Sequence, residues 1–252
     1  MTEAVKDGIT VNLVYDGRAA KVMLNQDKVR QIEEYYAQCE LEGANEHQVE
    51  ESQKAVAKME VIIGDPDRLR AVAEDCIKHY ETRVAEGATV AGKAMFVCSN
   101  RNIAYDFYKI VKELRPKWTE KKICDDGVVL SEKDKKELKP MEKIKLVMTR
   151  NKDDEKDLFD MLGTKEDRKE FDRQFKNPKS NFKIAIVVDM WLTGFDVPEL
   201  DTIYIDKPIQ QHTLIQTISR VNRVCEGKDK GLIVDYIGCL LYTSPSPRDM
   251  RR

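Results

Sequence analysis

The sequence predicts an α/β fold with a doubly wound, mostly parallel sheet and a helical N-terminal segment. Short unbroken runs of β-branched and apolar residues, such as residues 184–188, are typical of strands buried on both faces of a sheet. Stretches with helical spacing separate most of these runs, which gives the order strand, helix, strand, helix, strand, strand, helix, strand. Several runs end in polar or glycine-bearing turns, and open α/β sheets bind ligands beyond the carboxyl ends of their strands.

Residues 1–90 are expected to form a mostly helical segment that precedes the main domain. A short strand pattern occupies residues 9–15, and helical spacing with dense charge follows it. Asp65 can cap the next helix, and Pro66 fits its first turn. The apolar residues of that helix fall on one face, and they are Leu69, Val72, Ala73, Cys76, Ile77 and Tyr80.

Residues 87–94, Gly-Ala-Thr-Val-Ala-Gly-Lys-Ala, fit most of the phosphate-loop pattern G-x-x-x-x-G-K-[ST]. A phosphate loop must follow a strand and open a helix, because the free amides of the helix start hold the phosphates. This segment instead follows a helix and leads into a strand, and Ala94 has no hydroxyl for magnesium. We therefore expect only a helix-ending glycine and a loop.

Two further strands end in polar turns. Residues 94–98 lead into Ser99, Asn100 and Arg101 and then an amphipathic helix, whose start Ser99 or Asn100 can cap. Residues 144–149 form the next strand and end in Thr149, a second strand-end position suited to phosphate contact. The lysine-rich residues 116–140 between them show little periodicity, and we expect an exposed, solvated insertion rather than a DNA-binding patch.

The stretch from residue 183 to residue 223 organises the chain. A buried strand is followed by the turn Thr193-Gly194-Phe195-Asp196, which we therefore expect at the carboxyl edge of the sheet, and a second short strand ends at Asp206. On a helix starting near Gln210, the side chains of Gln216, Arg220 and Arg223 share one face. Guanidinium groups are permanently charged and donate in a rigid fork, so this face suits a polyphosphate.

These residues resemble a known family. The Thr-Gly-Phe-Asp turn is similar to motif V, and residues 216–223, Gln-Thr-Ile-Ser-Arg-Val-Asn-Arg, are similar to motif VI of superfamily 2 helicases and translocases. The wording is closest to the motor (R) subunit of type I restriction enzymes. Ser219 and Asn222 stand where motif VI often has glycine, and Val188 stands where motif V often has threonine. The turn at residues 99–101 resembles motif IV of the same family.

The resemblance implies a second RecA-like motor domain over residues 91–238, part of an ATP-dependent DNA translocase and endonuclease. Arg220 and Arg223 would be arginine fingers that reach toward ATP and Mg²⁺ held mainly by a first motor domain in cis. The resemblance further implies double-stranded DNA and the modification and specificity subunits as partners. It assigns Gln216, Gly194 and Asp196 to nucleotide contact and Ser99, Asn100, Arg101, Thr149 and Thr193 to the DNA backbone.

Alternatives remain for this region. Asp196 could simply cap its turn, and the two arginines could lie on a solvated helix face. The whole chain could be the second motor domain of another superfamily 2 DNA helicase, or a non-enzymatic nucleotide-binding or interaction module of doubly wound fold. Neither Asp201 nor Asp206 with Lys207 makes a convincing nuclease cluster, so no nuclease residues are assigned.

The amino-acid composition limits the kinds of partner, metal site and compartment that we expect for this chain. Charged residues make up 35% of the 252 residues, yet the formal net charge is only -2. This balance predicts solvated helices rather than a surface that attracts nucleic acid over its whole area. Six cysteines without a C-x-x-C pair and only three histidines argue against zinc and favour a reducing, cytoplasmic compartment. No apolar run approaches the length of a membrane span. Residues 239–252 lack periodicity and carry two Ser-Pro steps, so we expect a non-native tail and a truncated chain.

Overall fold

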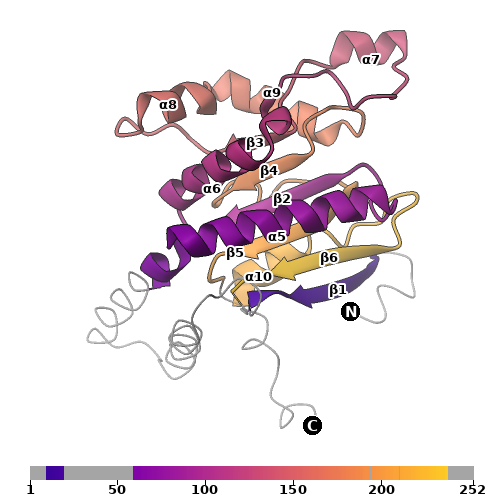
Figure 1. Cartoon of the computed structure of the whole chain (residues 1–252). Coiled ribbons are helices and arrows are strands. Elements are labelled where there is room, and N and C mark those ends of the chain that lie inside the picture. The colour runs from indigo at the N-terminus through magenta and orange to yellow at the C-terminus, as the bar shows by residue number, and fades with distance from the viewer. Residues whose placement is uncertain (1–9, 20–58, 193, 210, 238–252) are drawn as a thin grey trace, which may run out of the picture.

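The computed structural model describes residues 10–19, 59–192, 194–209 and 211–237. Six strands form one sheet in the order β1-β6-β5-β2-β4-β3, and every neighbouring pair is parallel (Figure 1). The expected α/β fold with a parallel sheet is therefore confirmed. The strands are β1 (Asn12–Gly17), β2 (Lys93–Cys98), β3 (Ile144–Val147), β4 (Ile184–Val187), β5 (Leu200–Asp206) and β6 (Lys230–Asp235).

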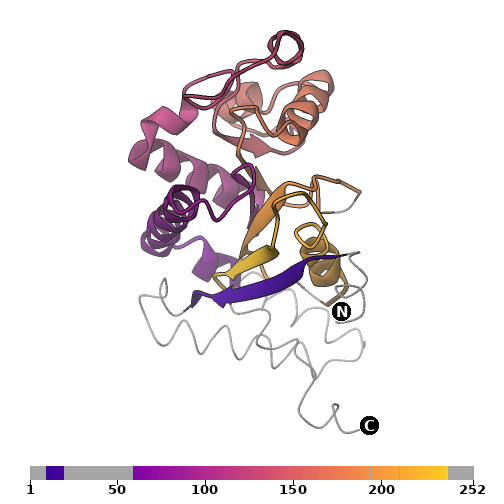
Figure 2. The ribbon, with the colours of Figure 1, turned by 90° about the vertical axis from the view of Figure 1, so that its right-hand side faces the viewer.

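Helices cover both faces of this sheet. Figure 2 shows α5 and α6 on one side and α10 on the other, so the sheet is doubly wound as expected. A β-strand that is buried on both faces has mostly apolar side chains, and each residue of β2, β3 and β4 is buried, including the two lysines Lys93 and Lys145. The helical elements are α5 (Pro66–Ala85), α6 (Arg101–Leu114), the short 3₁₀ helix η1 (Pro116–Thr119), α7 (Glu132–Glu137), α8 (Lys156–Leu162), α9 (Lys165–Lys176) and α10 (Gln211–Ile218).

Aromatic residues fill the two layers between the sheet and its helices. On one face, the rings of Phe96 in β2 and Phe107 in α6 stack with their centroids 3.9 Å apart. Toward the other face, Phe175 of α9 packs edge-on against Phe182, which lies just before β4, at 4.9 Å. These contacts explain why the chain alternates strands with helices whose apolar residues lie on one side.

Local sequence signals set the helix boundaries. Asp65 caps α5 by accepting a hydrogen bond from the backbone N–H of Arg68 at 3.1 Å, and Pro66 is the first residue of that helix, both as expected. Asn100 caps α6 in the same way through Ile103 N–H at 3.0 Å. Gly87 follows the end of α5 with φ +66°, a left-handed conformation that favours glycine.

The sheet also includes chain that precedes residue 91, the expected start of the main domain. Strand β1 pairs with β6 from Asn12 beside Lys230 to Gly17 beside Asp235, and α5 packs against α6. An edge strand has only one pairing partner, and the burial of β1 is incomplete. Its sequence therefore shows a strand without showing which sheet that strand joins.

The connection from β4 to β5 crosses over β2, and its described residues form no helix. It begins at the carboxyl end of the sheet, where Lys207 Nζ donates to Val188 O at 3.1 Å and to Asp189 Oδ1 at 2.6 Å. It ends at Leu200, the first residue of β5. We call residues 188–199 the crossover segment, and it carries the Gly-Phe-Asp part of the motif V turn from the carboxyl end of the sheet to the amino end.

Three sequence-based expectations fall outside the described residues. They concern Thr193, the charged helical stretch before residue 59 and the tail at residues 239–252. Within the described part of the chain, every helix is too short or too polar to span a bilayer.

Candidate functional site

The turns that follow β2 and β3 lie at the carboxyl end of the sheet, on either side of β4. Arg101 joins them, because its Nη1 donates to Thr149 O at 2.6 Å. Its Nη2 lies 2.5 and 2.6 Å from the two carboxylate oxygens of Asp154. The structure thus brings Arg101 and Thr149 together, as their shared strand-end positions predict.

Asp154 was not singled out by the sequence, yet it holds this edge together. Its side chain is only 6% exposed, and it also accepts a hydrogen bond from Asn151 N–H at 2.6 Å. In the sequence, Asp153, Asp154 and Glu155 form an acidic run in which no member is distinguished. The carboxylate neutralises the Arg101 guanidinium, which leaves Ser99, Asn100 and the exposed Thr149 as the remaining expected residues at this edge.

The motif VI region departs from the expected helix. Helix α10 ends at Ile218, so Gln216 lies in the helix while Arg220 and Arg223 lie beyond it, and the expected single helical face is wrong. The last turn tightens because Arg220 N–H bonds to Thr217 O at 3.1 Å and the hydroxyl of Ser219 donates to Gln216 O at 2.6 Å. The serine at this position thus takes part in ending the helix.

The fold nevertheless brings the expected motif V and motif VI residues together. Arg220 Nη1 donates to Phe195 O at 2.6 Å, and its Nε donates to Gln216 O at 3.2 Å. Arg223 Nε lies 3.5 Å from Asp196 Oδ1, with the two side chains 51% and 58% exposed. Arg220 therefore bonds only to neutral carbonyl groups within the described residues, whereas Arg223 has one loose ionic contact.

This region lies toward the amino ends of β1 and β6, not at the carboxyl edge where we expected it. The backbone of Arg223 forms an antiparallel bridge with Thr10, which precedes β1. Val221 O would lie 2.3 Å from a Cβ atom added to Gly231, the second residue of β6. The expectation is wrong because the described residues of the crossover segment form no helix and run back along the sheet. Its later residues therefore lie near the amino ends of the strands.

Aromatic and lysine side chains fix the crossover segment. The rings of Trp191 and Phe195 stack with centroids 4.0 Å apart and planes 3° apart, although Trp191 adopts a strained φ of 69°. Lys176 Nζ lies 5.0 Å from the centroid of the Phe195 ring. Lys228 Nζ donates to the carbonyls of Pro198 and Leu200, at 2.9 and 2.7 Å. Burial lowers the pKa of Lys228 to about 8.

The lysine of the phosphate-loop lookalike is structural. Lys93 is fully buried, and its Nζ donates to Phe182 O at 2.6 Å while lying 5.1 Å from the ring centroid of Phe175. Desolvation holds the pKa of Lys93 well below its usual range. The segment follows α5 and enters β2, so the expected absence of a strand-to-helix phosphate loop here is confirmed.

A buried ion pair supports the carboxyl end of the sheet from the α5 side. Arg68 and Asp206 are 1% and 0% exposed, and Arg68 Nη2 lies 2.5 Å from Asp206 Oδ1. Arg68 also donates to Ile63 O at 3.1 Å and Tyr236 O at 3.3 Å. Asp206 is thus committed to a structural contact. Within the described residues, no three histidine, cysteine or acidic side chains converge as a metal site.

Comparison with known proteins identifies the family. Residues 90–238 match the family described as T1R_D3-like, Type I restriction enzyme subunit R domain 3. The chain belongs to the type I restriction enzyme R subunits. It is 35% identical over 241 residues to the type I restriction enzyme HindI endonuclease subunit of Haemophilus influenzae, which covers 94% of this chain and 20% of that protein.

Two further relatives of this R-subunit chain agree. It is 36% identical over 238 residues to a protein named as a candidate type I restriction enzyme MjaIXP endonuclease subunit in Methanocaldococcus jannaschii, with 94% of this chain and 20% of that protein covered. A solved fragment of a candidate HsdR subunit from Vibrio vulnificus YJ016 shares the fold, with a TM-score of 0.53, 11% identity and coverage of 97% of this chain and 36% of that one. The chain spans about a fifth of the length of these curated relatives.

Proposed function

We propose that this chain is the second RecA-like motor domain of a type I restriction R subunit, a DNA translocase and endonuclease driven by ATP. The contact between Arg220 and the motif V turn carries this proposal. Arg220 Nη1 bonds to Phe195 O, so the guanidinium is positioned by a neutral group and keeps its full positive charge. A charge held in this way is available to a phosphate brought by another domain.

Arg220 and Arg223 would then act as arginine fingers. In phosphoryl transfer, negative charge builds on the transferring group, and a positioned guanidinium stabilises it. ATP and Mg²⁺ would be held mainly by a first motor domain in the same protein, with Gly194, Asp196 and Gln216 completing the nucleotide contact. Asp196 and Arg223 are both more than half exposed, which leaves them open to such a neighbour.

The carboxyl-edge turns would face the backbone of double-stranded DNA. Ser99, Asn100 and Thr149 supply hydroxyl and amide groups there, and Thr193 belongs to the same proposal. Arg101 would act by holding the two turns in register through Asp154 rather than by carrying free charge to a phosphate. The protein would work in the cytoplasm with modification and specificity subunits, and this chain alone would be inactive.

The arginine-finger role can be tested in an R subunit that carries this segment, assembled with its partner subunits. Arg220→Ala and Arg223→Ala should each lower DNA-stimulated ATP hydrolysis, by about 10³-fold for a true finger, while DNA binding stays close to normal. Arg70→Ala is the matched control, because Arg70 is an exposed arginine paired with Glu113 on the surface. Normal hydrolysis by both motif VI variants would overturn the assignment.

A further inference from the structure

A pocket of about 460 Å³ opens beyond β3, the edge strand of the sheet. Helices α6, α8 and α9 contribute to its walls, together with η1 and the segment that leads into β3. Its apolar surface includes Met141, Met161 and Phe171. A pocket of this size suits a small organic molecule. Its lining includes none of the motif IV, V or VI residues assigned above.

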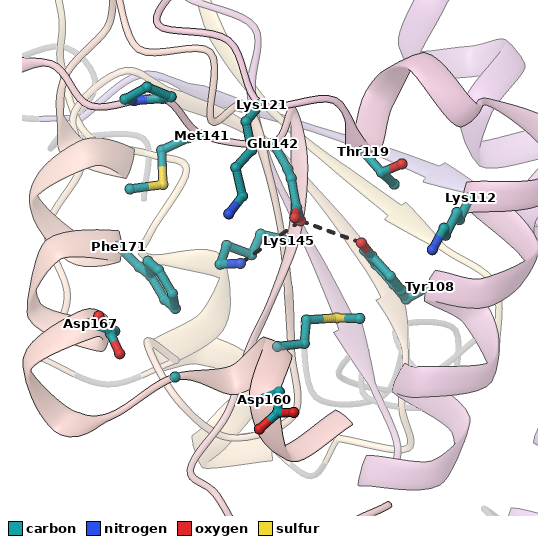
Figure 3. A pocket seen from close by; sticks show the side chains of 13 residues that line it. Tyr108, Lys112, Thr119, Lys121, Met141, Glu142, Lys145, Asp160, Asp167 and Phe171 are labelled. Carbon is teal, nitrogen blue, oxygen red and sulfur yellow. Dashed lines mark hydrogen bonds and ion pairs between the residues drawn. The ribbon is translucent and has the colours of Figure 1, made fainter. Parts of the chain in front are cut away.

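Three lysines line the pocket: Lys112, Lys121 and Lys145. Figure 3 shows Lys121, which follows η1, and Lys145, which lies in β3, approaching the same space, with Lys112 on α6 across from them. Among the described residues, Lys112 and Lys121 have no hydrogen-bond acceptor, and Lys145 approaches only Glu142, at 3.8 Å. Lysine donates three hydrogen bonds and accepts none, so these groups have unused donors.

Lys145 is the most informative of the three. Its side chain is only 8% exposed, and its Nζ lies 4.5 Å from the centroid of the Phe171 ring. Among the described residues its ionic contact is Glu142, at 3.8 Å, which is too long for a hydrogen bond. Burial lowers the pKa of Lys145, the charges of Glu142 and Asp167 partly oppose this shift, and the charge of Lys121 adds to it. A buried ammonium with unused donors gains from an anion.

The pocket also contains carboxylates, and two of the three are already engaged. Glu142 accepts a hydrogen bond from the Tyr108 hydroxyl at 3.3 Å in addition to its contact with Lys145 (Figure 3). Asp167 accepts from the backbone N–H and the hydroxyl of Thr164, at 2.7 and 2.9 Å, in the capping box of α9. Asp160 is the third, and it is exposed. Because two of the carboxylates already have partners, the lysine ammonium groups are the charged groups in the lining with the most unused hydrogen-bonding capacity.

We infer that this pocket binds a small organic anion, with its phosphate or carboxylate on Lys145 and Lys121 and its flat apolar body on Phe171, Met141 and Met161. Lys112 supports the headgroup from α6. This inference does not rest on the proposed motor function, because none of the residues it uses belongs to the helicase motifs.

The test is a calorimetric or NMR titration of the full 252-residue chain with four probes: adenosine monophosphate, benzoate, adenosine and inorganic phosphate. We expect saturable binding of adenosine monophosphate or benzoate, tighter than that of adenosine or phosphate. Which of the two organic anions binds better tells whether the headgroup is phosphate or carboxylate. Lys145→Met keeps the aliphatic stem over Phe171 and should weaken binding at least tenfold.

Matched variants make the outcome decisive. Lys169→Met removes one charge from the exposed side of α9, outside the pocket, and should leave binding unchanged. Lys121→Met changes an exposed side chain and serves if Lys145→Met fails to fold. Arg70→Ala, which removes an exposed arginine outside the pocket, should also keep binding. The inference would be overturned if neither organic anion saturates the chain at about 10 mM. It would also be overturned if Lys145→Met and Lys121→Met both bind as tightly as the unchanged chain, or if adenosine or phosphate alone binds as tightly as the organic anions.

Discussion

The carboxyl-edge turns and the motif V and VI region hold their arginines in different ways. Arg101 is bound by both oxygens of Asp154, a carboxylate that is 6% exposed. Arg220 instead donates to two backbone carbonyls, and Arg223 has one exposed ionic contact at 3.5 Å. A carboxylate cancels the charge of a guanidinium, whereas a carbonyl orients it and leaves the charge in place.

The difference separates a structural arginine from arginines that suit an anionic ligand. All three occur in motif-like stretches at the ends of elements, so their sequence context does not distinguish them. Their partners distinguish them, because the charge of Arg101 is neutralised by a carboxylate of the same domain. Carbonyl partners leave a charge available only where the side chain can be reached, because Lys228 also donates to two carbonyls but is buried and anchors the crossover segment.

The largest expected effect on stability comes from adding a side chain at Gly231, where motif VI packs against β6. Gly231→Ala places a Cβ atom 2.3 Å from Val221 O, so the backbone must shift, and we expect a loss of about 3 kcal/mol in the free energy of unfolding. Chemical denaturation measures it. Gly17→Ala is the control, since its nearest neighbour is the flexible Tyr15 side chain at 3.3 Å. Equal stability of the two variants would contradict this packing of motif VI.

A smaller loss of stability should follow from removing the contact between Asp154 and Arg101 at the carboxyl edge. Asp154→Ala leaves Arg101 and Asn151 N–H without their acceptor, and lost hydrogen bonds to a charged group predict a destabilisation of about 2 kcal/mol. The neighbouring Asp153 is exposed, so Asp153→Ala should be close to neutral. Should thermal unfolding show both variants alike, the two turns do not depend on Asp154.

The smallest effect is expected at Asp196. Its contact with Arg223 is exposed and 3.5 Å long, so Asp196→Ala should change the free energy of unfolding by no more than about 0.5 kcal/mol. Added salt should reduce this effect further, because salt screens exposed charges. A loss as large as that of Asp154→Ala would show that both regions hold their arginines equally firmly and would remove the contrast between them.

Much of the fold is predictable from the chain because its strands are short apolar runs and its helices have clear starts. Asp65 and Asn100 cap their helices by hydrogen bonds within three residues, so local sequence suffices. The candidate site is only partly predictable. Asp154 pairs with Arg101 across 53 residues of the chain. Because Asp154 stands in a run of acidic residues, the sequence does not show which of them pairs with Arg101. Helix α10 ends five residues before Arg223, where helical spacing alone suggested continuation.

The sequence by itself determined the parallel α/β class, the family and most of the polar residues that meet in two regions, Asp154 being the exception. Those features depend on periodicity, burial and motif wording, which act over a few neighbouring residues. Only the tertiary structure decided where these regions lie on the sheet and which charges remain available. It did so because the crossover segment runs the length of the strands, and because charge pairing depends on side chains that the chain order keeps far apart.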